Sequence, residues 1–156
     1  MAVRVQSEDF DIGAECAALS RGRHDIGAMV TFTGLVRGDS GGRPLVSMTL
    51  EHYPGMTEAE LARVEAEASA RWPLQACLII HRIGTLGPGE NIVLVITASA
   101  HRRAAFEAAD FLMDYLKSRA PFWKKEVFAD GEVRWVDARE CDAAAAARWA
   151  GSGSAS

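Results

Sequence analysis

Residues 101–119 place apolar side chains on one face of a helix, and this pattern is the strongest constraint on the fold. The positions that share the face are Ala104, Ala105, Ala108, Phe111, Leu112, Tyr115 and Leu116. Pro121 lacks a backbone N–H and disfavours a helical Ala120, so the helix is expected to end near residue 120. A helix with one apolar stripe has to bury it, and we expect this helix to pack on a sheet.

Strand patterns surround this helix along the chain. Stretches that are rich in apolar and β-branched residues, or that alternate, predict strands at 3–5, 26–36, 45–53, 74–83 and 91–100, and a hairpin of 126–128 with 133–136. Further helices are predicted at 10–19, from a Thr57–Glu60 capping box to Pro73, and at 139–149. This order predicts a single α+β domain over residues 1–150 with a largely antiparallel sheet, followed by a flexible Gly/Ser tail at 151–156.

Composition excludes several classes of function. The chain has 156 residues, 49% of them hydrophobic, which suits one compact domain. A formal charge of -4 argues against a general nucleic-acid or membrane-surface binder. Cys16, Cys77 and Cys141 form no CxxC pair, and the histidines have no metal-ligand spacing, so neither a disulfide framework nor a metal site is indicated. No signal peptide or membrane-spanning run is recognised, and a cytoplasmic protein is expected.

Four cations surround the bend made by Ala-Pro-Phe-Trp at residues 120–123: Lys117, Arg119, Lys124 and Lys125. They either complement the dipole at the end of a helix or line a pocket for an anionic ligand beside aromatic walls. Lys117 lies roughly opposite the apolar stripe, close to Phe106 and Met113 on the helical wheel.

A second cationic cluster opens the same helix. Ser99 is the expected N-cap, and His101, Arg102 and Arg103 occupy the first turn, where acidic residues are favoured. A bound anion would remove this conflict, although the side chains could equally bend away into water. Arg37, at the end of a strand and next to a Gly-rich loop, is by itself typical of a solvated strand end.

Several runs, taken together, resemble the large, catalytic subunits of molybdopterin synthase. They are TFTGLVR (31–37), LEHYPGMTE (50–58), RWPL (71–74), IHRIG (80–84), SAHR (99–102), MDYLKSRAPFWKKE (113–126) and RWVDARE (134–140). The runs are collinear and, with the flanking residues, the resemblance extends from about residue 26 to residue 149.

The resemblance implies a fold and a reaction. Family members adopt an α/β hammerhead-type fold, dimerise through the large subunit, and bind one small ubiquitin-like subunit at each end of a heterotetramer. They transfer sulfur from a thiocarboxylate on the C-terminal Gly-Gly tail of the small subunit to cyclic pyranopterin monophosphate (precursor Z), which forms the dithiolene of molybdopterin. The resemblance implies no cofactor and no metal.

The resemblance also implies site residues. Lys117 and Lys124 match the two active-site lysines, and the adjoining Lys125 and Glu126 are expected to shape the pocket. The residues that match the site for the pterin phosphate are Arg37, His101 and Arg102, and Leu35 and Val36 are added to the substrate-binding set. Some relatives have lysine at the position of Leu35, so only a backbone contact there would survive the difference. Arg134 and Arg139 match a basic C-terminal segment, and Arg139 is expected to reach the site of a neighbouring subunit.

Two functions from other classes compete with this interpretation. A non-catalytic anion- or nucleotide-binding module would explain both cationic clusters, but not the collinear runs. A ribonucleoprotein subunit would require steeply salt-dependent RNA binding, which the net charge disfavours.

Overall fold

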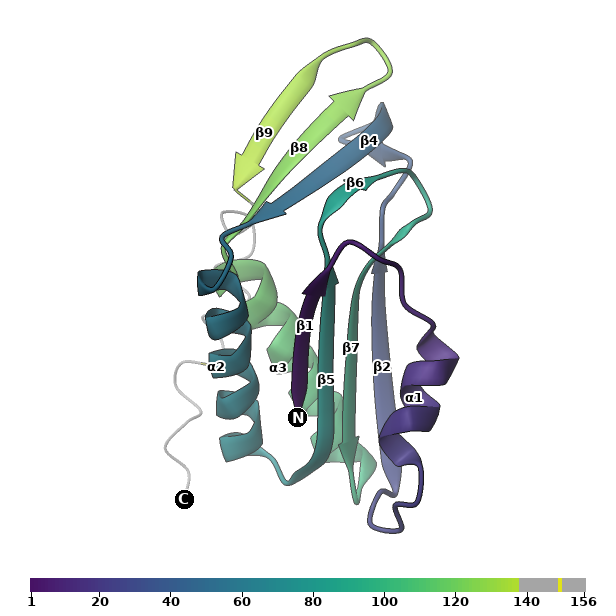
Figure 1. Ribbon diagram of the computed structural model, residues 1–156, viewed down its shortest axis with the longest axis vertical. Helices are drawn as coiled ribbons and strands as arrows, with labels where there is room; N and C mark the ends of the chain where they lie inside the picture. Colours follow the sequence, from purple (N-terminus) through teal and green to yellow (C-terminus); the bar gives the residue numbers. More distant parts are fainter. Residues whose placement is uncertain (138–148, 150–156) are drawn as a thin grey trace.

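A computed structural model describes residues 1–137 and Trp149, and this part of the chain forms two β-sheets and three α-helices (Figure 1). The mixture of helices with largely antiparallel strands confirms the predicted α+β class. The helix predicted at 139–149 and the tail at 151–156 lie outside the described residues, and the boundary at residue 150 stays a prediction. Within the described residues, no helix is both long enough and apolar enough to cross a membrane.

One sheet has fewer strands but more strand residues than the other and is called the larger sheet; its strand order is β1-β5-β7-β2. Its strands are β1 (Ala2–Gln6), β2 (Ala28–Leu35), β5 (Leu74–Arg82) and β7 (Asn91–Ser99). β5 and β7 are antiparallel neighbours, as are β7 and β2, whereas β1 runs parallel to β5. The central strands β5 and β7 are almost continuously buried, as expected for strands covered on both faces.

Alternate residues of these strands belong to two separate cores. Cys77, Ile79, Val93 and Val95 pack in the core beneath α2 (Met56–Arg71) and α3 (Arg102–Arg119). The residues between them, such as Ile80 and Leu94, form the opposite core with side chains of α1 (Ile12–Ser20). Figure 1 accordingly shows α3 behind the sheet and α1 on its other side.

α3 follows the predicted stripe closely. Its buried residues are Ala105, Ala108, Ala109, Phe111, Leu112, Tyr115 and Leu116. Ala104, predicted for the stripe, is only half-buried, and Ala109 takes a place in it instead. The helix ends at Arg119, and Ala120 is extended (φ -71°, ψ 125°), which confirms the effect expected of Pro121.

Both predicted N-caps are wrong. α2 begins after Gly55, whose N–H donates to the Glu58 carboxylate at 2.6 Å, and the Thr57 hydroxyl donates instead to the Pro121 carbonyl at 3.0 Å. α3 begins after His101, and no side chain of the described residues caps it, because the Ser99 hydroxyl donates to the Pro73 carbonyl at 2.9 Å. In both cases a partner that is distant in sequence takes the hydroxyl that a local rule assigned to the cap.

The smaller sheet lies at one end of the larger one, at the top of Figure 1. It consists of β3 (Asp39–Ser40), β4 (Arg43–His52), β8 (Phe122–Phe128) and β9 (Val133–Asp137) in this order, with β6 (Gly84–Leu86) also paired to β4. β8 begins at Phe122, four positions before the predicted hairpin strand, because its first residues pair with β4 as well as with β9. The lysines after the bend therefore lie on a strand.

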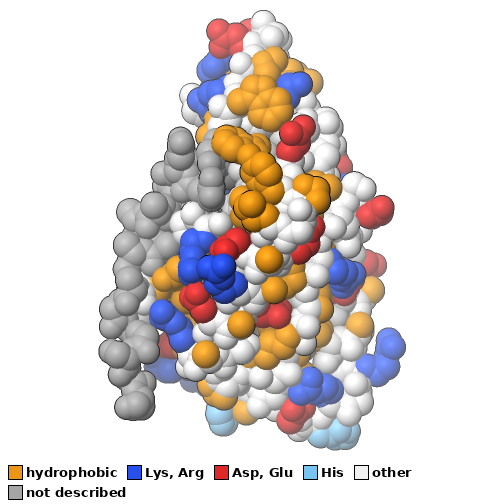
Figure 2. All heavy atoms as spheres, turned by 60° about the vertical axis from the view of Figure 1, so that its left-hand side comes forward, with side chains coloured by type: hydrophobic (Ala, Val, Ile, Leu, Met, Phe, Trp, Pro, Cys, Tyr) orange, Lys and Arg blue, Asp and Glu red, His pale blue; other side chains and the backbone are white. Residues whose placement is uncertain are grey.

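Apolar side chains are exposed on the smaller sheet, among them Val46 on β4 and Val133 and Trp135 on β9. Figure 2 shows apolar atoms gathered over this upper part of the molecule, above a region where charges of both signs mix. From this side, the part of the molecule formed by the smaller sheet is therefore more apolar than the part below it.

Candidate functional site

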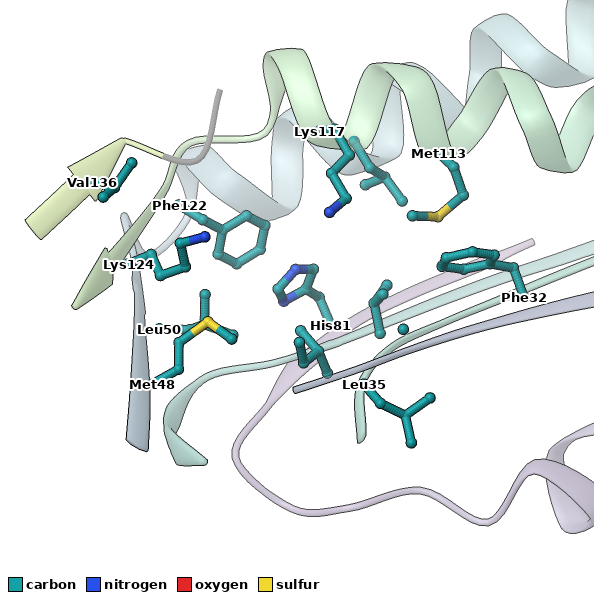
Figure 3. Close-up of a pocket in the computed structure, with 14 residues that line it drawn as sticks. Phe32, Leu35, Met48, Leu50, His81, Met113, Lys117, Phe122, Lys124 and Val136 are labelled. Atoms are coloured by element: carbon teal, nitrogen blue, oxygen red, sulfur yellow. The ribbon is translucent and has the colours of Figure 1, made fainter. Parts of the chain in front are cut away.

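A cavity of about 200 Å³ lies where the two sheets and the end of α3 meet (Figure 3). Its walls are largely apolar and are contributed by β2, β4, β5, β7, α3, β8 and β9; they comprise Phe32, Gly34, Leu35, Met48, Leu50, Ile92, Val93, Met113, Leu116, Phe122 and Val136. Among the described residues, the ionisable side chains in this lining are His81, Lys117 and Lys124. An apolar cavity with a few convergent polar groups is the usual form of a small-molecule site.

Lys117 and Lys124 reach the cavity from different layers of the fold. Lys117 is exposed in the last turn of α3, whereas Lys124 lies on β8, on the same strand face as Phe122. Figure 3 shows both ammonium groups directed toward the space above His81. No described carboxylate forms an ion pair with either lysine, so both charges are available to a ligand.

His81 is a site residue that sequence reasoning missed. Its ring stacks on Phe122 with 3.8 Å between centroids, and its Nδ1 lies 2.8 Å from the carbonyl oxygen of Arg82. Its pKa is lowered to about 4, mainly because burial disfavours the imidazolium; the charges of Lys117 and His52 act in the same direction, and the Arg82 hydrogen bond opposes them. A histidine interrupting the apolar run Leu-Ile-Ile-His-Arg-Ile at 78–83 was the available signal.

Glu126 and Lys125, which the resemblance placed beside Lys124, lie elsewhere. Glu126 is buried under the smaller sheet and accepts a hydrogen bond from Arg134 at 2.7 Å. Burial opposes its ionisation, but hydrogen bonds from Arg134 and Ser40 and the charge of Lys124 lower its pKa on balance. The Lys125 ammonium lies 5.9 Å from the centre of the Trp135 ring, on the strand face opposite to Lys124. Neither side chain lines the cavity.

The residues before the Gly-rich loop differ in their access to the cavity. The Leu35 side chain lines it, whereas Val36 is buried in the core of the smaller sheet. The backbone of Val36 is occupied, because its N–H donates to the Glu90 carbonyl at 2.9 Å and its carbonyl accepts from the Gly89 N–H at 2.8 Å. Arg37 is exposed just beyond and is absent from the described lining.

The second predicted cluster lies at the other end of α3. His101, Arg102 and Arg103 line an open hollow together with Phe106 and Glu107, and Arg103 pairs with Glu107 at 3.5 Å. A helix rises about 1.5 Å per residue, so Arg102 and Lys117 are separated by roughly 22 Å along α3. The described chain therefore does not bring the two clusters together. Phe106 belongs to this hollow, and only Met113 of the two predicted neighbours accompanies Lys117.

The distribution of lysines is a further signal that sequence reasoning overlooked. The chain has 17 basic residues, yet its lysines are confined to positions 117, 124 and 125. The other basic residues are all arginines. Among the described residues, every ion pair with a carboxylate uses an arginine, apart from the pair between His52 and Glu58. The lysines of this chain therefore lie at the cavity or next to a residue that lines it. Arg139, predicted to reach a neighbouring site, lies outside the described residues.

Comparisons with known proteins agree on one family. The family model described as "MoaE protein" matches residues 5–119. The chain is 63% identical over 148 residues to the molybdopterin synthase catalytic subunit of Mesorhizobium japonicum, covering 94% of this chain and 92% of that protein.

Solved structures give the same result. The molybdopterin biosynthesis MoaE protein from Burkholderia ambifaria superposes with a TM-score of 0.83 at 51% identity, covering 96% of this chain and 98% of that one. Molybdopterin synthase from Staphylococcus aureus gives a TM-score of 0.77 at 32% identity, covering 85% and 95%.

Proposed function

Because this chain belongs to the MoaE family, we propose that it is the catalytic subunit of a molybdopterin synthase. Its substrates are cyclic pyranopterin monophosphate and the thiocarboxylated C-terminus of a small ubiquitin-like subunit, and its product is the dithiolene of molybdopterin. The assembly is a homodimer of this chain with one small subunit at each end. A cytoplasmic location remains a prediction, which cell fractionation would test.

The observation that carries the proposal is the meeting of Lys117 and Lys124 at one apolar cavity. Both the pterin phosphate and the thiocarboxylate are anions, and the cavity offers them two ammonium groups. Neither ammonium forms an ion pair with a described carboxylate, and the carboxylate of Glu126, whose pKa the charge of Lys124 helps to lower, is already paired with Arg134. Apolar walls reduce the screening of these charges by water, which strengthens their action on a bound anion.

Each sulfur transfer divides into two bond exchanges. The thiocarboxylate sulfur attacks an electrophilic carbon of the pterin side chain, so that a C–S bond forms and a carbon–oxygen bond on that carbon breaks. In one of the two transfers the leaving oxygen is that of the phosphate, which opens the cyclic ester, and in the other it departs as water. Water then hydrolyses the acyl–sulfur link, which returns a carboxylate to the small subunit and leaves the sulfur on the pterin.

We assign Lys117 to proton transfer near the incoming tail and Lys124 to stabilising the negative charge of the thiocarboxylate or of the transition state. A positioned acid or base contributes about 10²–10⁴-fold and a preorganised charge donor about 10²–10³-fold.

Single-turnover sulfur transfer tests these roles. Lys117→Ala and Lys124→Ala should each slow dithiolene formation from preformed thiocarboxylated small subunit by about 10²-fold or more. Lys125→Ala is the matched control, because its ammonium lies on the opposite face of β8, against Trp135. Near-normal rates for both Lys117→Ala and Lys124→Ala would sink the assignment. Absence of product from the unaltered protein would favour the non-catalytic anion-binding module.

The phosphate site requires a second copy of the chain. One pterin cannot contact both Lys117 and the His101–Arg102 cluster across roughly 22 Å of a single subunit. We therefore propose that His101 and Arg102 of one subunit complete the cavity of its dimer partner. Arg37, at the end of β2 beside the cavity, is proposed as a phosphate ligand within the same subunit.

Subunit mixing tests this arrangement. Lys117→Ala and Arg102→Ala dimers, each inactive, should regain about a quarter of normal activity after exchange of subunits, because half of the dimers become mixed and each mixed dimer contains one intact site. Mixing Lys117→Ala with Lys124→Ala is the control, since both lysines line the same cavity and no intact site can form. Failure of the first mixture, with exchange verified by mass, would refute a shared site.

A further inference from the structure

The imidazole of His81 is fixed from two directions in the cavity. Its face stacks on Phe122 at an angle of 18° between the ring planes. Its edge is held by the 2.8 Å contact between Nδ1 and the carbonyl oxygen of Arg82. Arg82 is itself immobilised, because its buried guanidinium donates to the carbonyls of Ser7 and Asn91. The ring is therefore held in one orientation by residues of β5 and β8.

This geometry selects one tautomer. A carbonyl oxygen can only accept a hydrogen bond, so Nδ1 has to carry the proton. In a neutral imidazole the other nitrogen, Nε2, is then an acceptor. No hydrogen bond joins Nε2 to any described residue, and the side chain lines the cavity.

Burial is the main cause that keeps the ring neutral, and the charged groups around it act in the same direction. Lys117 of α3 and His52 of β4 both disfavour the imidazolium, and His52 is itself occupied by Glu58 at 3.1 Å. The guanidinium of Arg82 is directed to Ser7, Glu90 and Asn91, and Lys124 of β8 lines the cavity on the same side as Phe122. Figure 3 shows Lys117 pointing toward the ring from α3, on the opposite side of the cavity from the strand that carries His81.

From this arrangement we propose that His81 is a positioning residue for Lys117. The described conformation does not join the two side chains, but rotation of the long Lys117 side chain brings its ammonium to Nε2, which accepts a hydrogen bond from it and holds it over the floor of the cavity. Lys117 is a long side chain with considerable rotamer freedom, and no described carboxylate restrains it. An acceptor on the rigid sheet supplies the restraint. The consequence for sulfur transfer rests on the function proposed above, whereas the hydrogen bond itself does not.

A positioning role suits His81 better than the role of general base. A base works best when its pKa is near the operating pH. The imidazole of His81 has a pKa of about 4, so it is neutral at pH 7 and binds a proton weakly. A neutral acceptor leaves the charge and the proton on Lys117.

The tautomer is measurable on the unaltered protein. The chain contains 4 histidines, and the nitrogen resonances of the one that disappears in His81→Phe identify His81. Long-range nitrogen–proton NMR spectra should show protonated Nδ1 and unprotonated Nε2 from pH 6 to 8. An imidazolium, or a proton on Nε2, in this range would overturn the proposal without any assay of activity.

Two substitutions separate the acceptor from the ring. His81→Phe keeps an aromatic ring against Phe122 and removes the acceptor, whereas His81→Gln places an amide oxygen near the position of Nε2 and removes the ring. Loss of a hydrogen bond to a charged group corresponds to about 10–100-fold, so His81→Phe should slow sulfur transfer by this factor and His81→Gln should recover most of the rate. Equal losses in both variants, with equal falls in melting temperature, would indicate a structural role and overturn the proposal.

A double-mutant cycle identifies the lysine through which His81 acts. His81→Phe should cost little in a Lys117→Ala background and keep its full effect in a Lys124→Ala background. Additive effects with Lys117→Ala would refute the proposal. The Lys117 signal is observable independently, because the chain has three lysines; its carbon-13 side-chain resonances should move in His81→Phe while those of Lys125 do not. If the proposed function is wrong, the unaltered protein will give no product. The NMR measurement would still show whether Lys117 donates a hydrogen bond to His81.

Discussion

The guanidinium of Arg134 on β9 donates two hydrogen bonds to the buried carboxylate of Glu126 on β8, with 2.7 Å between Nη2 and Oε1 and 3.2 Å between Nε and Oε1. Only the guanidinium side of the pair reaches solvent, since the side chain of Arg134 is 54% exposed and that of Glu126 only 4%. The pair connects the two strands two positions beyond Lys124, and it holds the carboxylate ionised inside the smaller sheet.

We expect Arg134→Gln to lower the free energy of unfolding by about 1–3 kcal/mol at pH 7, because a buried carboxylate loses its charged partner. The pKa of Glu126 is lowered in the folded protein, so the stabilisation is complete above the ordinary pKa of glutamate, about 4.3, and is lost as the pH falls through the lowered value. Urea unfolding at a series of pH values from 7 downward measures the loss. In a Glu126→Gln background the same substitution should cost much less; an undiminished cost would contradict the explanation.

Glu65 on α2 should show the opposite pH dependence. It is buried, and its Oε2 has no hydrogen-bond partner among the described residues; burial raises its pKa, although the N-terminal amino group and hydrogen bonds from Cys77 and Ala2 act against this. A raised carboxyl pKa means that stability is present at low pH and is lost as the pH rises through the folded value. Glu65→Gln should therefore gain stability relative to the unaltered protein, on the order of 1 kcal/mol, at pH 8 but not at pH 4. Glu8→Gln, which changes an exposed glutamate, is unfolded at the same two pH values as the reference. An equal gain in stability of Glu65→Gln at both pH values would exclude ionisation as the cause.

The buried hydroxyl of Thr57 fixes the bend before β8. It accepts from the Tyr53 N–H and donates to the Pro121 carbonyl, both at 3.0 Å. Thr57→Val keeps the shape but leaves both groups without this partner, and it should lower the free energy of unfolding by about 1–3 kcal/mol in urea titrations. Thr57→Ser retains the hydroxyl and should be less costly. If the serine variant is the less stable of the two, packing of the methyl group outweighs the hydrogen bonds.

Gly27 permits the close approach of the chain before β2 to the residue preceding His101. A Cβ at this position would lie 2.1 Å from the Ala100 carbonyl oxygen, and the Gly27 N–H donates to the Ser99 carbonyl at 2.9 Å. Gly27→Ala should therefore destabilise the protein by about 1–3 kcal/mol, seen as a lower melting temperature. Gly38→Ala is the control, because in the described part of the chain no heavy atom lies within 4 Å of its added Cβ. Similar melting temperatures for the two variants would show that the backbone relaxes at Gly27.

The spacing of apolar residues and the position of Pro121 were sufficient to predict α3 and the central strands of the larger sheet. The apolar stripe of α3, its end before Pro121, and the buried strands β5 and β7 all follow from local pattern, and the structure confirms them. The comparisons confirm the family and the catalytic-subunit function that the collinear runs suggested. The caps at Thr57 and Ser99 were wrong because their hydroxyls bind carbonyls 64 and 26 residues away, which no local rule anticipates.

The candidate site was less accessible to sequence reasoning. That Lys117 and Lys124 share a cavity depends on the pairing of β8 with β4, and the spacing of the lysines does not reveal this long-range contact. The roles of all the predicted site residues stay predictions, for the catalytic Lys117 and Lys124 as well as for Leu35, Val36, Arg37, His101, Arg102, Lys125, Glu126 and Arg139. His81 could be recognised only once Phe122 and the Arg82 carbonyl were placed around it.

The bend at Ala120 and Pro121 has a mechanical consequence. Lys117 is anchored through α3 to the larger sheet, and Lys124 is anchored through β8 to the smaller one, so the separation of the two ammonium groups depends on the angle between the sheets. A tilt of one sheet against the other would change the width of the cavity while leaving every strand register intact. The bend itself is restrained by the ring of Pro121, which fixes φ, and by the hydroxyl of Thr57, whose hydrogen bond to the Pro121 carbonyl connects the start of α2 to the residue before β8.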